Sequence, residues 1–167
     1  MEGNIVLLFF VVLMVVLICK GIIEEKRKEE KLRKRFQENY GKANKRQIKE
    51  EELERISHYC KDRIDKYTID ELTWNDLDLD LVYKQMAYTE SSLGDDYLYY
   101  MLRNPVREET ILLNRESKIS CLTTNEALRI KLQVLFARIG RIRDYSFSDY
   151  LEYLMHLLFF QLYSSLL

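Results

Sequence analysis

The chain has 167 residues, enough for one ordinary domain or for a membrane anchor followed by one small helical domain. It is 47% hydrophobic and 32% charged, a balance that excludes both a disordered tail and a wholly membrane-embedded protein. One Pro and five Gly disfavour a β-sandwich or barrel, and three Cys without CxxC spacing provide neither a disulfide framework nor a zinc cage. The net charge of −1 conceals a very uneven distribution of charges along the chain.

The first part of the chain is strongly apolar. Fifteen consecutive apolar residues run from Ile5 to Cys19, and Gly21, Ile22 and Ile23 continue the run beyond Lys20. A helix of about 19 residues, at a rise of ~1.5 Å per residue, is ~28 Å long and matches the hydrocarbon thickness of a bilayer. We therefore predict a transmembrane anchor over residues 1–23, with the membrane contacted by residues 5–23.

The residues on either side of this anchor predict its processing and orientation. A cleaved signal peptide is the main alternative, but the four residues before the run include no Lys or Arg, and no Ala-x-Ala site follows it. From Lys20 to Arg46 there are eleven Lys or Arg and five acidic residues. Because positive flanks stay in the cytoplasm, we predict a single-pass protein of the cell membrane with a cytoplasmic C-terminal body.

Residues 24–66 are predicted to form a charged helical stalk. Residues 24–46 are rich in Glu, Lys, Arg and Gln, with opposite charges three and four positions apart, and Gly41 is expected to interrupt the helix. A narrow apolar stripe at helical spacing follows, formed by Leu53, Ile56, Cys60, Ile64 and Tyr67. A solvated stalk is the favoured interpretation, and a basic segment that binds nucleic acid or anionic lipid is the alternative.

Residues 67–150 are predicted to form a small bundle of short helices. Several N-cap candidates between Thr73 and Asp80 precede a helix with apolar residues from Leu79 to Met86. The next three helices are expected from Ser91 or Ser92 to Asn104, over residues 108–122, and from Thr124 or Asn125 to Ile139, where Gly140 ends the last of them. Ser148 or Asp149 is a candidate start for one more helix.

Part of this bundle resembles the helical core domain of the MutS family of DNA mismatch-repair ATPases. That family shows Gly-x-x-x-Leu-x-x-x-Leu-x-x-Pro-Leu/Val-Arg followed by Leu-Leu-x-Arg. The residues that match without a gap are Gly94, Leu98, Leu102, Pro105, Val106, Arg107, Leu112, Leu113 and Arg115. Upstream, Ile69-Asp70-x-x-Thr73 and Thr89 fit more loosely. Each strong match has a packing role: Gly94 is expected to let a neighbouring helix approach closely, and Pro105 to end a helix.

The resemblance implies a membrane-anchored branch of the MutS family. An intact relative would bind mismatched DNA and would use ATP and Mg through a Gly-x-x-x-x-Gly-Lys-Ser/Thr loop. None of the five Gly of this chain has that spacing. We therefore predict no ATPase activity, no cofactor and no catalytic or metal-binding residue in this chain, and we do not expect it to be an enzyme.

Charge gives limited support for DNA binding by the body. Residues 66–110 hold ten acidic and four basic residues, the wrong sign for contacts with phosphate. Residues 111–150 are net +3, and the candidate DNA-backbone contacts there are Arg129, Lys131, Arg138, Arg141 and Arg143, with a solvated helix face as the favoured alternative. Asp76, Asp78 and Asp80 lack the pattern of a calcium loop and are better explained as helix caps.

Residues 151–167 are mostly apolar, and three explanations remain open for them: a last core helix, a second membrane segment, or a truncated protein. We favour a fragment of a longer protein. Two hypotheses about function follow. The first is a membrane-anchored fragment of a MutS-related protein. The second is a membrane-tethered interaction module that binds a partner protein or forms a homodimer, with no DNA or ATP role.

Overall fold

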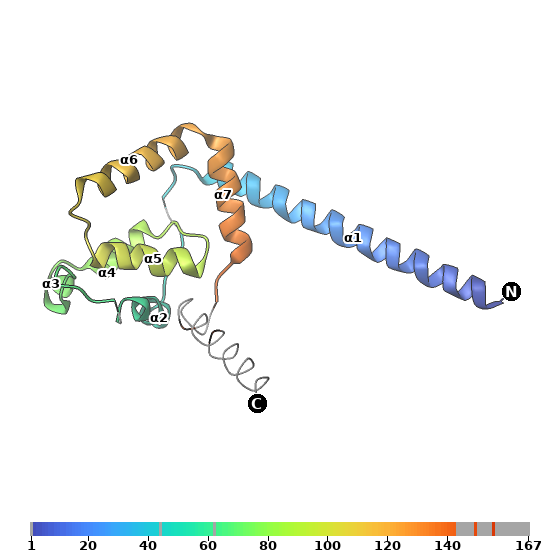
Figure 1. The fold of residues 1–167 in the computed structure, drawn as a ribbon, viewed down its shortest axis with the longest axis horizontal. Helices are drawn as coiled ribbons and strands as arrows, with labels where there is room; N and C mark the ends of the chain where they lie inside the picture. The colour runs from blue at the N-terminus through green and yellow to red at the C-terminus, as the bar shows by residue number, and fades with distance from the viewer. Residues whose placement is uncertain (1, 44, 62, 143–148, 150–154, 156–167) are drawn as a thin grey trace, which may run out of the picture. The chain divides into compact units, whose positions relative to one another are not determined.

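The protein is helical throughout the part of the chain that the computed structural model describes (Figure 1). The described residues are 2–43, 45–61, 63–142, 149 and 155, with the backbone alone given for 2–6 and 8. These residues contain seven helices and no strand, which confirms the predicted all-α class. The chain divides into two compact units, residues 1–41 and residues 42–167.

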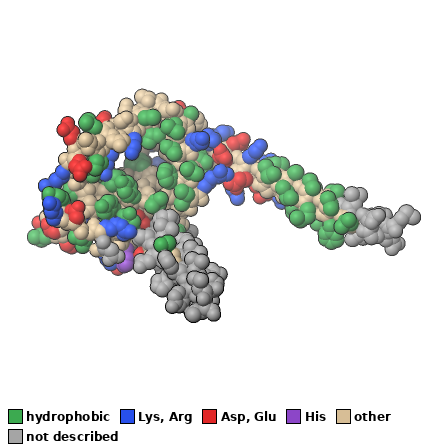
Figure 2. Space-filling model, in the orientation of Figure 1, with side chains coloured by type: hydrophobic (Ala, Val, Ile, Leu, Met, Phe, Trp, Pro, Cys, Tyr) green, Lys and Arg blue, Asp and Glu red, His purple; other side chains and the backbone are tan. Residues whose placement is uncertain are grey.

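The first unit is a single long helix, α1 (Glu2–Asn39). Its first half is apolar, and its second half carries ion pairs between residues four apart, such as Arg33 Nη2 with Glu29 Oε1 at 2.7 Å. Figure 2 shows the change along the helix, from hydrophobic side chains to a mixture of basic and acidic ones. The helix ends just before Gly41, whose φ of +73° favours glycine, so the predicted interruption is confirmed.

Within the described residues, no helix combines the length and the apolar content that are needed to cross a membrane. The predicted anchor over residues 5–23 lies partly outside these residues, because the side chains of 5, 6 and 8 are not described. The transmembrane part of the fold stays a prediction.

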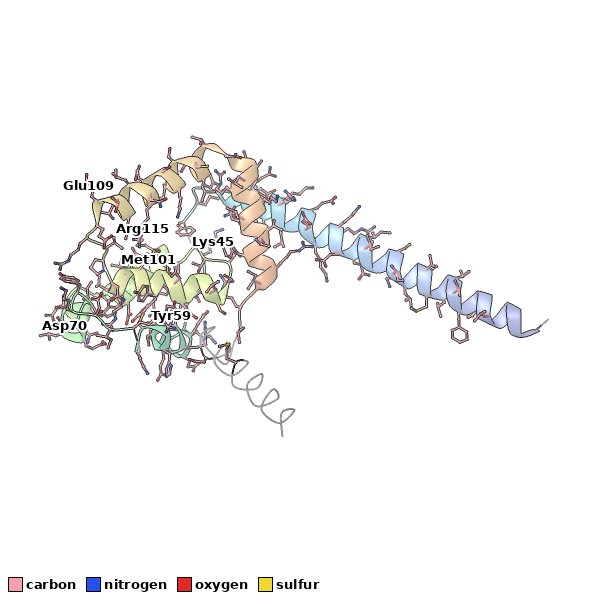
Figure 3. The ribbon with its side chains drawn as sticks, viewed as in Figure 1. Lys45, Tyr59, Asp70, Met101, Glu109 and Arg115 are labelled. Carbon is pink, nitrogen blue, oxygen red and sulfur yellow. The ribbon has the colours of Figure 1, made fainter. Side chains whose placement is uncertain are left out.

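The core of the second unit is formed by four helices, α2 (Glu50–Lys61), α3 (Glu71–Asp76), α4 (Leu79–Met86) and α5 (Ser92–Arg103). Aromatic rings occupy its centre: Tyr99 lies 4.9 Å from Trp74 and 5.2 Å from Tyr83 between ring centroids. Helix α2 packs against α5, where Tyr59, labelled in Figure 3, meets Tyr100 edge to face at 5.8 Å. Aromatic pairs in this geometry add stability beyond the burial of their area.

Helix α2 belongs to this core, although the sequence placed its residues in a stalk over 24–66. Leu53, Ile56 and Cys60 are buried, as expected of an apolar stripe that faces a core. The predicted continuation of the stripe was wrong, because the helix ends at Lys61 and both Ile64 and Tyr67 are exposed. The chain instead turns after the helix and returns to α5, where the Ile69 amide donates to the carbonyl of Arg103 at 2.9 Å.

Helices α3 and α4 are separated by a tight turn that the sequence did not reveal. Asp70 caps α3 by accepting a hydrogen bond from the Thr73 amide at 2.9 Å, upstream of the predicted caps at 73–80. Asp78 has a left-handed backbone with φ of 48° and provides no side-chain cap for α4. The next predicted boundary is confirmed: Ser91 caps α5, which ends at Arg103, two residues before Pro105.

Helices α6 (Glu109–Thr124) and α7 (Glu126–Ile139) form a hairpin joined by Asn125. The Asn125 side chain accepts from the Leu128 amide at 3.0 Å, and Gly140 ends α7 with φ of +74°, so both predicted signals are confirmed. The predicted start of a last helix at Ser148 or Asp149 and the segment 151–167 lie outside the described residues, apart from 149 and 155.

Candidate functional site

A buried ionic cluster surrounds the first turn of α5. Asp95 is fully buried, and its two carboxylate oxygens accept from Nη1 and Nη2 of Arg46 at 2.6 and 2.9 Å. Arg141 Nε donates to the same carboxylate at 3.2 Å, and the Thr89 hydroxyl also contacts it. The cluster thereby joins three segments: the residues before α2, the start of α5, and the residues after α7.

The electrostatics of this cluster favour the charged forms of its members. Burial alone would lower the pKa of Arg46, but the hydrogen bonds and charges of Asp95 and Glu52 outweigh it and raise that pKa above its ordinary value. Arg55 and Asp96 form a second buried pair at 3.6 Å. Because the carboxylate of Asp95 is enclosed on all sides, it is not accessible to a substrate. Its ion pairs hold segments of the fold together.

One family-matching residue, Gly94, lies next to this cluster. A Cβ atom added to Gly94 would lie 3.2 Å from Cβ and Cγ2 of Thr89. The group that approaches Gly94 is therefore a threonine of the preceding loop. The prediction that a neighbouring helix approaches Gly94 was wrong. Leu98 and Leu102 both pack against the core of the second unit.

The remaining family-matching residues lie beyond the end of α5. Pro105 follows the helix, and the guanidinium of Arg107 lies 4.1 Å from the ring centroid of Tyr67. Arg115 is half-buried on α6, where Figure 3 labels it. The structural role predicted for these positions stays a prediction.

The five candidate DNA-backbone contacts do not all face solvent. Arg129 donates to the carbonyls of Leu122 and Thr123 at 2.9 and 3.2 Å, which caps the C-terminal end of α6. Arg141 belongs to the ionic cluster. Lys131 and Arg138 are exposed on α7, and Arg143 lies outside the described residues. Arg129 and Arg141 are therefore engaged in contacts within the chain.

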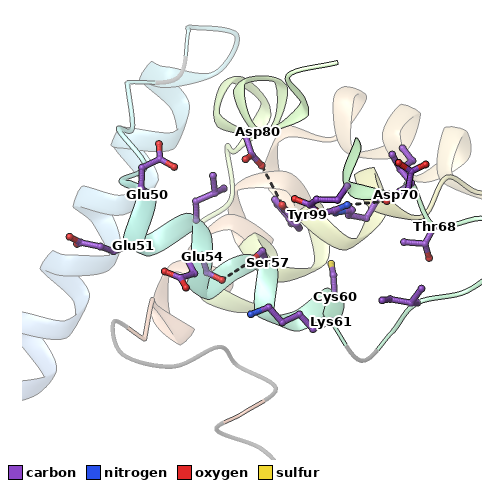
Figure 4. Close-up of a pocket in the computed structure, with 15 residues that line it drawn as sticks. Glu50, Glu51, Glu54, Ser57, Cys60, Lys61, Thr68, Asp70, Asp80 and Tyr99 are labelled. Carbon is purple, nitrogen blue, oxygen red and sulfur yellow. Dashed lines mark hydrogen bonds and ion pairs between the residues drawn. The ribbon is translucent and has the colours of Figure 1, made fainter. Parts of the chain in front are cut away.

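A groove of about 880 Å³ opens between α2, the 64–71 loop, α4 and α5 (Figure 4). Its apolar lining comes from Leu53, Cys60, Ile64 and Ile69, with the Tyr99 ring beside them. Six carboxylates and two cations also line it, and the carboxylates are those of Glu50, Glu51, Glu54, Asp70, Glu71 and Asp80. The groove therefore combines apolar side chains with an excess of carboxylates.

Several of these charged groups are held by contacts within the chain. Asp80 accepts from Trp74 Nε1 at 2.8 Å and from the Tyr99 hydroxyl at 3.3 Å. Arg103 pairs with Glu71 at 2.5 Å and lies 4.4 Å from the Trp74 ring centroid. Asp80 thus holds two aromatic rings of the core in place. Among the described residues, no group of side chains is arranged to hold a metal ion.

Two titratable side chains of the groove, the Cys60 thiol and the Tyr99 phenol, hold their protons more tightly than usual because their pKa values are raised. Burial raises the pKa of the Cys60 thiol to about 11, which keeps it protonated. Burial and the nearby charge of Asp80 also raise the pKa of Tyr99. The chemistry that this arrangement supports is binding, through an apolar surface with a negative edge.

Neither the cluster nor the groove was apparent from the amino-acid sequence. Arg46 and Asp95 are 49 positions apart and carry no local pattern that links them. The sequence signals that fall in or beside the cluster are Gly94, Thr89 and Arg141, and none of them pointed to a buried ionic pair. No family model, no curated protein and no solved structure matches the chain in the comparisons with known proteins.

Proposed function

We propose that this protein is a membrane-tethered interaction module, in which residues 5–23 of α1 anchor the chain in a lipid bilayer and the helical body binds a partner. The observation that carries the proposal is the exposure of apolar side chains on every side of α1. From Phe9 to Cys19 each residue is apolar and exposed, which covers about three turns of the helix. A helix that is apolar all round is typical of a buried or membrane-embedded segment.

The body has features of a scaffold. Its buried ion pairs hold segments of the fold together, and its groove has apolar and charged side chains that could contact a ligand. The MutS-like residues support a second part of the proposal, that the body is related to the MutS core domain. Direct DNA binding has less support, because Arg129 and Arg141 are engaged internally and the groove is acidic.

Membrane fractionation of the full chain tests the anchor. We expect the protein to stay in the membrane pellet after an alkaline carbonate wash. Replacing Leu13 and Val16 with Lys should release it, because each cation costs about 3 kcal/mol at the centre of a bilayer. The matched control replaces Glu30 and Glu38, in the charged half of α1, with Lys and should leave the protein in the pellet. Recovery of the unmodified chain in the carbonate supernatant would contradict the anchor.

Cysteine labelling tests the orientation. Cys121 is exposed on α6, whereas Cys60 is buried. A membrane-impermeant maleimide added to intact cells should leave Cys121 unlabelled, and permeabilised cells should give full labelling. Equal labelling in both samples would place the body outside the cytoplasm.

A further inference from the structure

The groove between α2 and α5 has the properties of a docking site for one chemical class of partner. We propose that it binds a basic amphipathic helix of a partner protein, with apolar side chains on its floor and Lys or Arg side chains against its carboxylate edge. This inference rests on the proposed function, because it names the surface through which the tethered body would bind its partner. Helix-in-groove binding of this kind needs an apolar floor and a complementary charged rim.

The floor provides the apolar part of the site. Leu53 and Cys60 lie on the same side of α2, two turns apart, and Ile69 faces them from the loop after α2. Ile64 also lines the groove and is 72% exposed, so it is available to an incoming side chain. A volume of about 880 Å³ accommodates several side chains of a helix.

The edge provides the charge. Glu51 and Glu54 are exposed on α2, and Figure 4 shows them on the same helix as Glu50. Glu50 pairs with Lys84 of α4 at 2.6 Å, and Arg103 is engaged with Glu71. The charges left to face a ligand are therefore those of Glu51, Glu54 and Asp70 against the single cation of Lys61, and this net negative charge favours a cationic partner and disfavours nucleic acid.

Peptide binding to the full chain in detergent micelles tests this inference. The probe is a fluorescent alanine-based helical peptide with lysines on one face and two leucines one turn apart, and fluorescence anisotropy reports its binding. A peptide with glutamates in place of the lysines is the charge control. We expect the lysine peptide to bind, the glutamate peptide to bind at least about tenfold more weakly, and added salt to weaken the lysine complex.

Variants of the protein locate the binding. Glu51→Lys with Glu54→Lys should weaken the lysine peptide about tenfold, because two favourable contacts become repulsive. Glu109→Lys with Glu116→Lys, an equal change of charge on α6, should leave binding unchanged. Ile64→Ser should weaken binding about threefold, whereas Ile119→Ser on α6 should not.

The outcomes separate this inference from the proposed function. Failure of the lysine peptide to bind, equal binding of both peptides, or equal losses in groove and control variants would overturn the groove site. None of these results alters the carbonate fractionation. Conversely, release of the chain from membranes would overturn the anchor and leave peptide binding intact.

Discussion

Asp95 is the residue whose surroundings contribute most clearly to stability. It is fully buried, and two guanidinium groups balance its charge. Replacing it with Asn removes the charge and leaves Arg46 buried without its main partner. Loss of one member of a buried ion pair costs about 3–5 kcal/mol, so we expect Asp95→Asn to lower the free energy of unfolding by that amount.

The matched variant for this prediction is Arg141→Ala. The Arg141 side chain is 33% exposed and is the second of two cations on Asp95, so its loss should cost only about 1 kcal/mol. Urea unfolding followed by circular dichroism measures both values. Equal losses in the two variants would mean that Arg46 alone does not balance the buried carboxylate.

Gly94 gives a second prediction at this scale. Ala favours a helix by about 1 kcal/mol over Gly, but here the new methyl group would meet Thr89 at 3.2 Å. We expect Gly94→Ala to destabilise the protein by about 1–2 kcal/mol, because overpacking outweighs the gain in helix propensity. Thr89→Ser removes Cγ2 and keeps the hydroxyl that contacts Asp95.

A double-mutant cycle of these two substitutions measures their coupling. The cost of Gly94→Ala should fall by at least about 0.5 kcal/mol in the Thr89→Ser background. Additive effects would show that the close approach of Thr89 does not limit residue 94.

Residues that act on their sequence neighbours could be predicted from the sequence, whereas contacts between residues far apart in the chain could not. Ser91, Asn125 and Gly140 act within a few positions of themselves, so residue type alone predicted their capping roles. The pairing of Arg46 with Asp95 depends on how the segments pack. The same applies to Arg129, which looked like a surface cation until the end of α6 was placed beside it.

At the scale of elements, α5 and α6 differ in how they are supported. Helix α5 contributes buried side chains to the second unit, whereas none of the described side chains of α6 is buried. Helices that bury little apolar surface open locally at low free energy. We expect amides of α6 to exchange with solvent at least about tenfold faster than those of α5, as measured by hydrogen–deuterium exchange.

A matched pair of truncations checks the same difference. Leu113 on α6 is 62% exposed, whereas Leu53 on α2 is 4% exposed. Leu53→Ala should cost about 2–4 kcal/mol and Leu113→Ala less than about 0.5 kcal/mol. Slow exchange in α6 together with a large cost at Leu113 would show that this helix is covered by a partner.

The element boundaries show where sequence reasoning succeeds. Pro105 restricts the backbone, and Gly41 and Gly140 permit a positive φ that other residues avoid, so the ends of α5, α1 and α7 were predictable. The division between α3 and α4 was not, because it depends on a left-handed Asp78 in a run that has helical composition. The end of α2 was missed because the apolar residues Ile64 and Tyr67 continue its spacing without its structure.

At the scale of the whole chain, composition predicted the helical class, and the charge change near Lys20 predicted two different halves of α1. The groove was not predictable, since its lining comes from α2, α4, α5 and the 64–71 loop. Three of its six carboxylates come from the acidic stretch 66–110, and the other three come from α2.

Because the thiol of Cys60 is buried, the folded chain loses stability as the pH rises into the alkaline range. Its folded pKa is about 11, compared with an ordinary value of 9.0. Because the folded state holds the proton more tightly, its contribution is complete below pH 9 and is lost as the pH rises towards 11. At pH 10 this loss is about 1 kcal/mol relative to pH 8.

Cys60→Ala isolates this effect. The variant is less stable at pH 8 because it lacks a buried side chain, but its free energy of unfolding should change about 1 kcal/mol less between pH 8 and pH 10. Cys121→Ala, at an exposed thiol, is the control and should show the full alkaline loss. Burial also raises the pKa values of Tyr83 and Tyr99, so these phenols add to the alkaline loss near pH 10, but they do so equally in all three proteins and cancel in the comparison. An alkaline loss of the same size in all three proteins would mean that the thiol of Cys60 ionises as freely in the folded chain as in the unfolded one.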